Sequence, residues 1–412
     1  MQRIGIARGG LSSIGATGLT IAALILSIGF GVGVTTRPGL TILAISTVIA
    51  FLLPVWVPLA VALVAMWFRS LVPELPSGLL LSDVAMGIFM LRWAAPWFLY
   101  ERDKRLQTST WWLLAFLSWA WIAMLFNQGE EHLALARISA YGALFIATSV
   151  TRGVAKPLYI LAALAAAIQV AVLVASGVIL VGDPHQLGQI AMAGIAGAQF
   201  VRNKVWRSAL FLLSLAGVAL CFRRGIWIAG AVEIGVLGLP LLRNRQGRKR
   251  LVLGVLVGAI AAFGMYQAQE ALTARLGLNE ESIVLRQEGW GNAITAIQAD
   301  PIVGHGWATA VESGQPAYNL GLNVAASVGI AGAVLIAGFF TALVLTLSKR
   351  SDRESVGVFA YLLGFLVLSM AEMTFYAAAA GTAAFFVLLG AAVGEHRHEP
   401  KTETLMLSLK HS

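Results

Sequence analysis

The amino-acid sequence predicts an all-α, polytopic membrane protein with about 12–14 transmembrane helices and one large loop outside the membrane. The 412 residues are 58% hydrophobic and only 12% charged, and their mean hydropathy is +0.80. Soluble domains carry about 25% charged residues, so this chain has half the usual charge. Apolar runs of about 20 residues recur throughout and do not alternate with period two, which favours helices over a transmembrane barrel.

Fourteen apolar runs are the expected transmembrane segments. They lie near residues 14–34, 39–53, 55–69, 80–99, 110–127, 133–150, 156–180, 186–201, 207–222, 225–242, 250–268, 319–347, 355–375 and 377–394. The second and third runs are short for crossing a bilayer and are separated by Pro54, so a re-entrant pair or one broken helix is an alternative for them. The chain thus divides into helices over 1–268, a loop over 269–318, further helices over 319–394 and a tail over 395–412.

The polar gaps between these runs alternate in charge. One set, which includes 102–105 and 243–250, holds 21 of the 29 basic residues. The positive-inside rule places this set in the cytoplasm, together with both termini, and places the loop over 269–318 in the periplasm or outside the cell. The net charge of +9 is then explained by cytoplasmic gaps. The expected partner is the lipid bilayer of the inner or plasma membrane, and no nucleic acid is expected.

Disulfide and metal chemistry are not expected. Cys221 is the single cysteine, so neither an intramolecular disulfide nor a Cys-x-x-Cys site can form. No two histidines have the spacing of metal ligands, and no His-Glu-x-x-His motif occurs. We therefore expect no metal and no cofactor.

The loop over 269–318 is the first place to expect a functional site, because the short turns elsewhere leave little room for one. Besides six acidic residues, it contains Arg275, Arg286, Trp290 and His305. Residues 285–301 predict an amphipathic helix that ends at its proline. The apolar stripe expected to pack on the membrane domain consists of Leu285, Trp290, Ala293, Ile294 and Ile297.

Two groups of arginines are candidates for binding an anion. Arg223 and Arg224 stand between two apolar runs at the outer mouth, where the positive-inside rule disfavours them. A guanidinium matches a phosphate bidentately, so an anion clamp is one interpretation and snorkelling to lipid headgroups is the other. Arg286 is either an anion ligand or the partner of a nearby glutamate. For Arg275, an ordinary surface charge is the stronger interpretation.

Two histidines on the predicted outer side, His185 and His305, are candidate site residues. His185 starts a predicted helix, where a role near the helix cap is the simpler interpretation. His305 lies between two glycines that permit a tight turn and close backbone approach. A histidine in such a loop can act as a general base, and an ordinary polar loop residue is the alternative.

Five segments, in order, resemble motifs of the O-antigen ligase and polymerase superfamily over roughly residues 180–335. They are GDPHQLGQ at 182–189, FRRGIW at 222–227, Arg286-x-x-x-Trp290-x-x-Ala293, DPIVGHGW at 300–307, and Tyr318-Asn319-Leu320 followed by VGIAG at 328–332. His185 stands where the family usually has asparagine, and Arg223 replaces its usual serine. Arg224 aligns with the arginine of the second motif.

The resemblance implies a membrane glycosyltransferase. Its donor would be a glycan on undecaprenyl pyrophosphate, its acceptor a hydroxyl on a glycan or a lipid, and other polysaccharide-assembly proteins would be possible partners. No metal or nucleotide sugar is implied. Because negative charge develops on the departing pyrophosphate, fixed guanidinium groups would stabilise the transition state, which points to Arg224 and Arg286.

One position departs from the ligase pattern, because Tyr318 stands where the ligase branch has its loop histidine. A tyrosine, with an ordinary pKa of about 10, is a poor base at neutral pH. His305 or Glu312 could take that role, or the protein could be a polymerase or a member without ligase activity. The absent histidine slightly favours a polymerase. The alternatives from other classes are a flippase or transporter of lipid-linked glycans and a non-catalytic member of an assembly complex.

Overall fold

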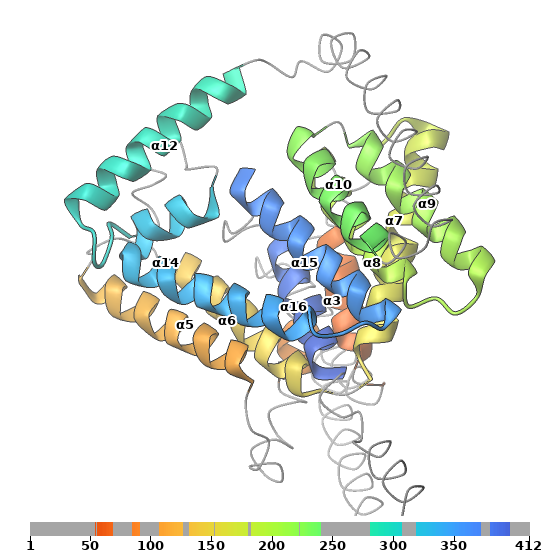
Figure 1. Cartoon of the computed structure of the whole chain (residues 1–412), viewed down its shortest axis with the longest axis horizontal. Helices are drawn as coiled ribbons and strands as arrows, with labels where there is room; N and C mark the ends of the chain where they lie inside the picture. The colour runs from red at the N-terminus through yellow and green to blue at the C-terminus, as the bar shows by residue number, and fades with distance from the viewer. Residues whose placement is uncertain are drawn as a thin grey trace, which may run out of the picture.

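The computed structural model describes residues 54, 56–68, 85–90, 107–126, 132–151, 153–179, 183–221, 223–239, 281–306, 319–371 and 380–395. Every regular element in this part of the chain is an α-helix (Figure 1). The helices are α3 (Trp56–Trp67), α5 (Thr108–Phe126), α6 (His132–Val150), α7 (Ala155–Ser176), α8 (Pro184–Ala198), α9 (Lys204–Leu220), α10 (Arg224–Gly238), α12 (Glu281–Ala299), α14 (Leu320–Leu347), α15 (Arg353–Ala371) and α16 (Ala380–Glu395).

The all-α class is confirmed for the described residues, and each of their helices except α12 falls on a predicted apolar run. Within the part of the chain that the structure describes, four helices are long and apolar enough to cross a membrane, namely α5, α7, α14 and α15. Shorter apolar helices cover Trp56–Trp67, Ile138–Val150 and Thr382–Glu395. These helices fit a membrane protein. The number of spans stays a prediction, because the runs 14–34, 39–53 and 250–268 lie outside the described residues.

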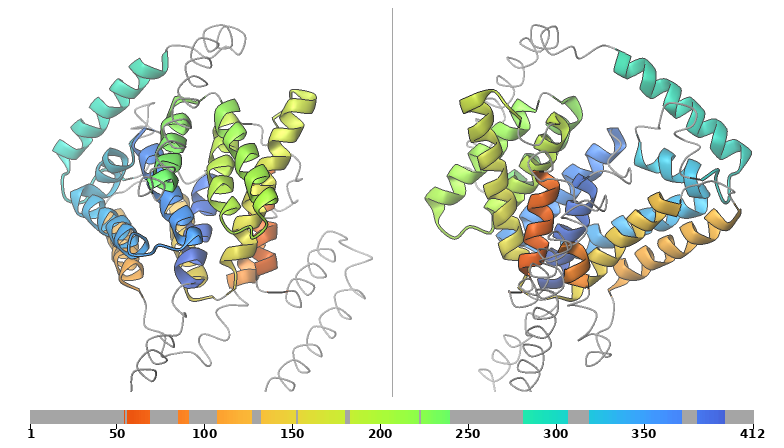
Figure 2. Two further views of the ribbon diagram at one scale, coloured as in Figure 1. Left: turned by 45° about the vertical axis from the view of Figure 1, so that its right-hand side comes forward. Right: turned by 180° about the vertical axis from the view of Figure 1, so that it is seen from behind.

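Helix α16 occupies the centre of the bundle. From Ala383 to Val393 its side chains are buried on every face of the helix. It packs most extensively on α6 and also contacts α3, α7 and α15 (Figure 2). Gly390 permits the close approach to α6, because a Cβ there would overlap the hydroxyl of Thr148. On the opposite side, the ring of Phe385 stacks on Phe365 of α15 with centroids 3.5 Å apart.

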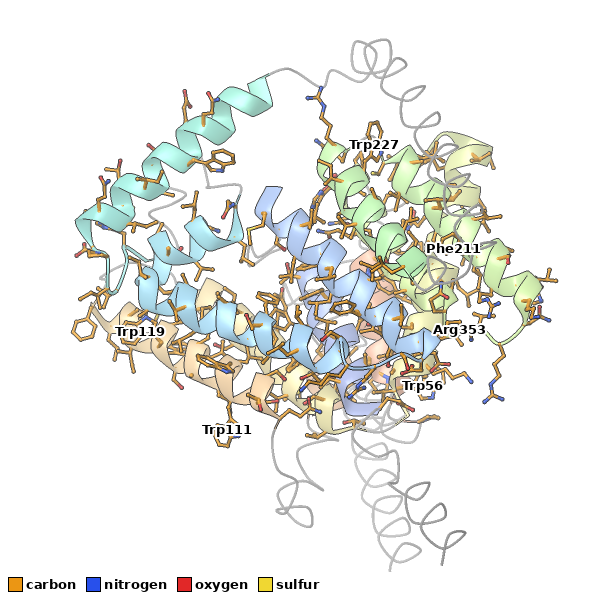
Figure 3. All side chains as sticks on the ribbon, in the orientation of Figure 1. Trp56, Trp111, Trp119, Phe211, Trp227 and Arg353 are labelled. Atoms are coloured by element: carbon orange, nitrogen blue, oxygen red, sulfur yellow. The ribbon has the colours of Figure 1, made fainter. Side chains whose placement is uncertain are left out.

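Gaps that the charge pattern assigns to the cytoplasm meet at one end of this bundle. The amide of Gln107 donates to the carbonyl of Val393 at 3.2 Å, and the backbone N–H of Gly153 donates to the carboxylate of Glu395 at 3.0 Å. Glu354 lies within electrostatic range of Lys156, Arg202 and Glu395. In Figure 3, Arg353 marks this end, and Trp227, near the start of α10, lies toward the opposite one. The described parts of these gaps therefore lie at one end of the bundle, and the side of the membrane that this end faces stays a prediction.

Arg353 connects α15 to the end of α8, so its removal should destabilise the fold. Its guanidinium donates to the carbonyl of Gln199 at 2.7 Å and to that of Val201 at 3.3 Å, just beyond the last turn of α8. A cation at a helix C-terminus is favourable and each bond is charge-assisted, but the site is exposed, so we expect Arg353→Ala to cost about 1 kcal/mol. The midpoint of thermal unfolding in detergent measures this loss. Lys349→Ala, at an exposed neighbouring position, should leave the midpoint unchanged.

Candidate functional site

The start of α8 is a capped helix N-terminus. The carboxylate of Asp183 accepts a 2.9 Å hydrogen bond from the backbone N–H of His185, and Pro184 occupies the first helical position. Both residues favour a helix start at this point. The imidazole of His185 lies 3.0 Å from the side-chain amide of Gln189, one turn along the helix. Asp183 rather than His185 therefore provides the cap, and the histidine ring is paired within its own helix.

The start of α10 lies beside the start of α8. Gly188 of α8 packs directly on Ile226, since a Cβ on the glycine would lie 2.6 Å from the Ile226 Cγ2. Arg223 is the N-cap residue of α10, and its Nε is buried without a hydrogen-bond partner among the described residues. Arg224 is the first helical residue and is exposed. The structure thus brings the first two motifs together and places two guanidinium groups at a helix N-terminus, an arrangement that suits an anion.

Helix α14 is broken near its start, and the turn over 300–306 fills the break. Val328 and Gly329 have non-helical backbone angles, with φ of +77° and ψ of 173° at the glycine. The carbonyls freed by the break accept hydrogen bonds from the turn and from a tryptophan. These bonds are His305 N–H to Ala326 O at 2.8 Å, Gly306 N–H to Ser327 O at 2.9 Å and Trp119 Nε1–H to Val328 O at 2.8 Å. The fourth motif is therefore docked on the VGIAG segment of the fifth.

Glycines make this docking possible. Gly304, Gly306 and Gly329 all have positive φ, which residues with a Cβ rarely adopt. A Cβ on Gly304 would lie 2.6 Å from the backbone N of Gly329, and a Cβ on Gly329 would overlap the carbonyl of Ile302. In the return direction, the N–H of Ile330 donates to the carbonyl of Pro301 at 2.8 Å. Backbone therefore contacts backbone on both sides, which fixes the position of the turn.

The turn holds His305 next to Asp300. The His305 Nε2 and the Asp300 Oδ2 are 3.4 Å apart, and the two side chains are 32% and 54% exposed. This separation is longer than an ordinary hydrogen bond, and the contact is an ion pair only when the imidazole is protonated. A carboxylate beside one ring nitrogen favours the tautomer with its proton there and leaves the lone pair on the other nitrogen. The pair combines a rigid backbone with access from outside, as a general base and its orienting group require.

Asn319 joins α14 to α15. Its side-chain oxygen accepts from the N–H of Leu322 at 3.1 Å, which caps α14, and its amide donates to the carbonyl of Met370 at 3.1 Å. Helix α15 also packs along α10. Helix α15 therefore lies between α14 and α10, and the turn that carries His305 and the start of α10 lie on different sides of it (Figure 1).

Helix α12 lies along the first part of α14 and apart from the rest of the bundle (Figures 1 and 2). Its buried face is made of small residues, because Ala293 packs on Ala326 and Gly289 is buried too. The predicted stripe is therefore wrong in part. Ile297 packs against α14 as expected, but Trp290 and Ile294 are 40% and 47% exposed on its flank. Small side chains allow the two helices to approach closely, and the larger ones stay outside the contact.

The remaining candidates lie outside what the structure describes. Arg275, Glu312 and Tyr318 fall in undescribed segments, and for Arg286 only the backbone, within α12, is described. Sequence reasoning missed two residues that shape the site. The sequence marks Asp300 only as the first residue of the DPIVGHGW segment, although it lies five residues before His305, and nothing in the sequence marks Trp119 as the partner of the α14 break.

A scan against protein-family models finds no match to this chain, and a search of curated proteins finds none either.

Proposed function

We propose that this protein is an integral-membrane glycosyltransferase of the O-antigen polymerase and ligase type. It would move a glycan from undecaprenyl pyrophosphate to an acceptor hydroxyl at the outer face of the membrane, with polymerisation favoured over ligation. The observation that carries the proposal is the Asp300–His305 pair on a turn fixed against the broken helix α14. A glycosyl acceptor must lose a proton as its oxygen attacks, and a carboxylate-oriented histidine can remove it.

In this proposal, the arginines at the start of α10 stabilise the negative charge that develops on the departing pyrophosphate. As the glycosidic bond to phosphate breaks, its electron pair leaves with the pyrophosphate, whose charge then grows. Arg224 is exposed at a helix N-terminus whose N-cap side chain makes no capping hydrogen bond, so its guanidinium and the backbone N–H groups of the first turn can bind that leaving group. No acidic residue occupies the first turn of α10 to compete for them. Arg286 and Arg275 remain candidates for the same anion from the loop.

The flippase or transporter alternative has weaker support. Broken helices in transporters leave carbonyls and helix ends free to coordinate substrate or ions. In α14 the carbonyls of Ala326, Ser327 and Val328 are all occupied by protein donors. The break therefore serves to dock a loop.

The reaction itself is tested by giving the purified protein an undecaprenyl-pyrophosphate oligosaccharide. A ladder of glycan lengths supports a polymerase, and a single adduct on an added acceptor supports a ligase. Binding of the lipid-linked glycan without either product would contradict the enzyme proposal and favour the non-catalytic member of an assembly complex. Transport of the lipid-linked glycan across vesicles without product would favour the flippase.

Arg224→Ala is expected to lower turnover by about 10²–10³-fold with a smaller change in KM, because the charge that it stabilises is greatest in the transition state. Arg224→Lys keeps a positive charge without the planar fork and should recover only part of the rate. Initial rates of pyrophosphate-lipid release measure both. Arg286→Ala is the companion test, since an enzyme should lose turnover whereas a transporter with a site at the membrane midplane should be nearly unaffected. An Arg224→Ala protein with wild-type rates would remove this residue from the proposed site.

A further inference from the structure

Glu233 is a fully buried carboxyl in the middle of α10. Its exposed fraction is 0%, and neither carboxyl oxygen has a hydrogen-bond partner among the described residues. It lies nine residues beyond Arg224, which at 1.5 Å per residue is about 14 Å along the helix axis. Since the hydrocarbon core of a bilayer is about 30 Å thick, this places Glu233 near the membrane midplane. The glycosyl transfer proposed above does not use it.

The groups around Glu233 include no cation from the described residues. Helix α15 brings Tyr361 within electrostatic range of the carboxyl, and α7 brings Tyr159. Nearby, α8 contributes the methyl group of Met192, while α9 packs on α10 through Val218 at Gly230, and neither of these side chains titrates. No cation among the described residues offsets the burial of the carboxyl. Nothing described could neutralise an ionised Glu233.

The tyrosines make this a polar cluster contributed by three helices. Tyr159 is 0% exposed, its hydroxyl lacks a hydrogen-bond partner among the described residues, and its ring stacks on Phe200. Tyr361 is 3% exposed and packs against Phe365 and Phe385. On α15, Gly364 permits the close approach of α10, because a Cβ there would lie 3.0 Å from the carbonyl oxygen of Ala229. An isolated carboxylate in such surroundings is strongly disfavoured, so it must carry a proton or bind a cation.

We propose that Glu233, with Tyr159 and Tyr361, forms a buried proton-binding site that holds one proton while α10 and α15 are packed together. A neutral carboxyl needs no counter-ion, whereas a metal ion would need several more oxygen ligands, and no group of three acidic, histidine or cysteine side chains occurs among the described residues. The proton leaves only when α10 and α15 separate and water reaches the carboxyl. Because α10 also carries Arg223 and Arg224 at its start, movement of this helix would link the proton at the midplane to the anion site at the outer mouth.

Infrared difference spectroscopy of wild type against Glu233→Gln, in lipid at neutral pH, tests the state of the carboxyl. We expect the wild type to show the carbonyl band of a neutral carboxylic acid that the variant lacks. Bands of a carboxylate in its place would overturn the proposal, and if their position depended on added Na⁺ they would indicate a cation site. Should Glu233→Gln fail to fold, Glu233→Asp serves as the reference, since its shorter carboxyl changes the position of the band.

The pH dependence of unfolding gives a second readout. If Glu233 holds a proton in the folded state and loses it on unfolding, then raising the pH favours the unfolded state. The unfolding equilibrium constant should therefore rise by up to tenfold per pH unit above about pH 5. The unfolding equilibrium constant of the wild type should rise more steeply with pH than that of Glu233→Gln. Equal pH profiles of the two proteins would contradict a proton bound in the folded state.

Tyr361→Phe removes a hydroxyl that could donate a hydrogen bond to the ionised carboxylate. The rise of its unfolding equilibrium constant should therefore extend to higher pH than in the wild type. A profile equal to that of the wild type would remove the tyrosine from the site. Neither measurement uses a glycan or a lipid pyrophosphate, so both are independent of the proposed glycosyl transfer.

Discussion

Replacing Gly329 with alanine is expected to detach the turn over 300–306 from α14 and to destabilise the protein by about 3–5 kcal/mol. The glycine has a φ of +77° with ψ of 173°, a conformation that is strained for any residue with a Cβ. The added methyl would also overlap the carbonyl of Ile302 and lie 2.8 Å from the N–H nitrogen of Val303. Both effects act on the same contact. Thermal unfolding in detergent and glycan-transfer activity should therefore fall together.

Gly291→Ala is the matched control for this change. Gly291 lies in the neighbouring helix α12, is exposed, and has no atom within 4 Å of the position of an added Cβ. Alanine is a better helix former than glycine, so this variant should be neutral or more stable by about 0.5–1 kcal/mol. If Gly329→Ala were as stable as Gly291→Ala, the backbone docking between the turn and α14 would not exist in solution.

His305→Ala is the second change with a large expected effect, a loss of about 10²–10⁴-fold in turnover. In the proposed reaction its imidazole takes the proton of the acceptor hydroxyl, and the alanine variant keeps the backbone hydrogen bond to Ala326 that positions the turn. Stability should change little. Initial rates of glycan transfer at saturating lipid-linked substrate, measured beside a thermal melt, separate lost chemistry from lost folding.

Two further variants decide which group is the base. Asp300→Asn removes the charge next to His305 and should reduce turnover by about tenfold or more while the protein stays folded. Tyr318→Phe should be mild. If Tyr318→Phe abolished activity and His305→Ala did not, the tyrosine hydroxyl would take the role that the ligase branch gives to a histidine.

The helices could be predicted from the sequence because membrane-spanning segments must satisfy their backbone hydrogen bonds internally and must be apolar. Helix α7 was expected over 156–180 and is found over Ala155–Ser176, and α15 was expected over 355–375 and begins at Arg353. The start of α8 and the end of α12 before Pro301 follow local rules that act within a few residues, although the cap residue of α8 is Asp183 and not His185. Such features depend little on the rest of the fold.

The contacts between elements could not be predicted in the same way. The run over 319–347 is predominantly apolar and Gly329 is one of several glycines in it, so the sequence alone does not separate an intact helix from one broken at Val328 and Gly329. The stripe predicted for α12 contains Ala293, which is buried, but it also contains Trp290 and Ile294, which are exposed, and it omits Gly289, which is buried. An amphipathic pattern favours large apolar residues, whereas close packing of two helices favours small ones. The pairing of Asp300 with His305 depends on the shape of the turn, which is set by its contact with α14.

The central place of α16 has a consequence for biogenesis. A ribosome makes this helix last among those described, yet it is the most completely enclosed of them, and both Gly153 and Gln107 bond to its final turn or close to it. The earlier helices therefore enter the bilayer without the element around which they close. We expect chains that are released before about residue 395 to insert but not to assemble, and to be removed by membrane proteases. Epitope tags or fusions that delay the insertion of α16 should lower the yield of folded protein more than tags of the same size at the N-terminus.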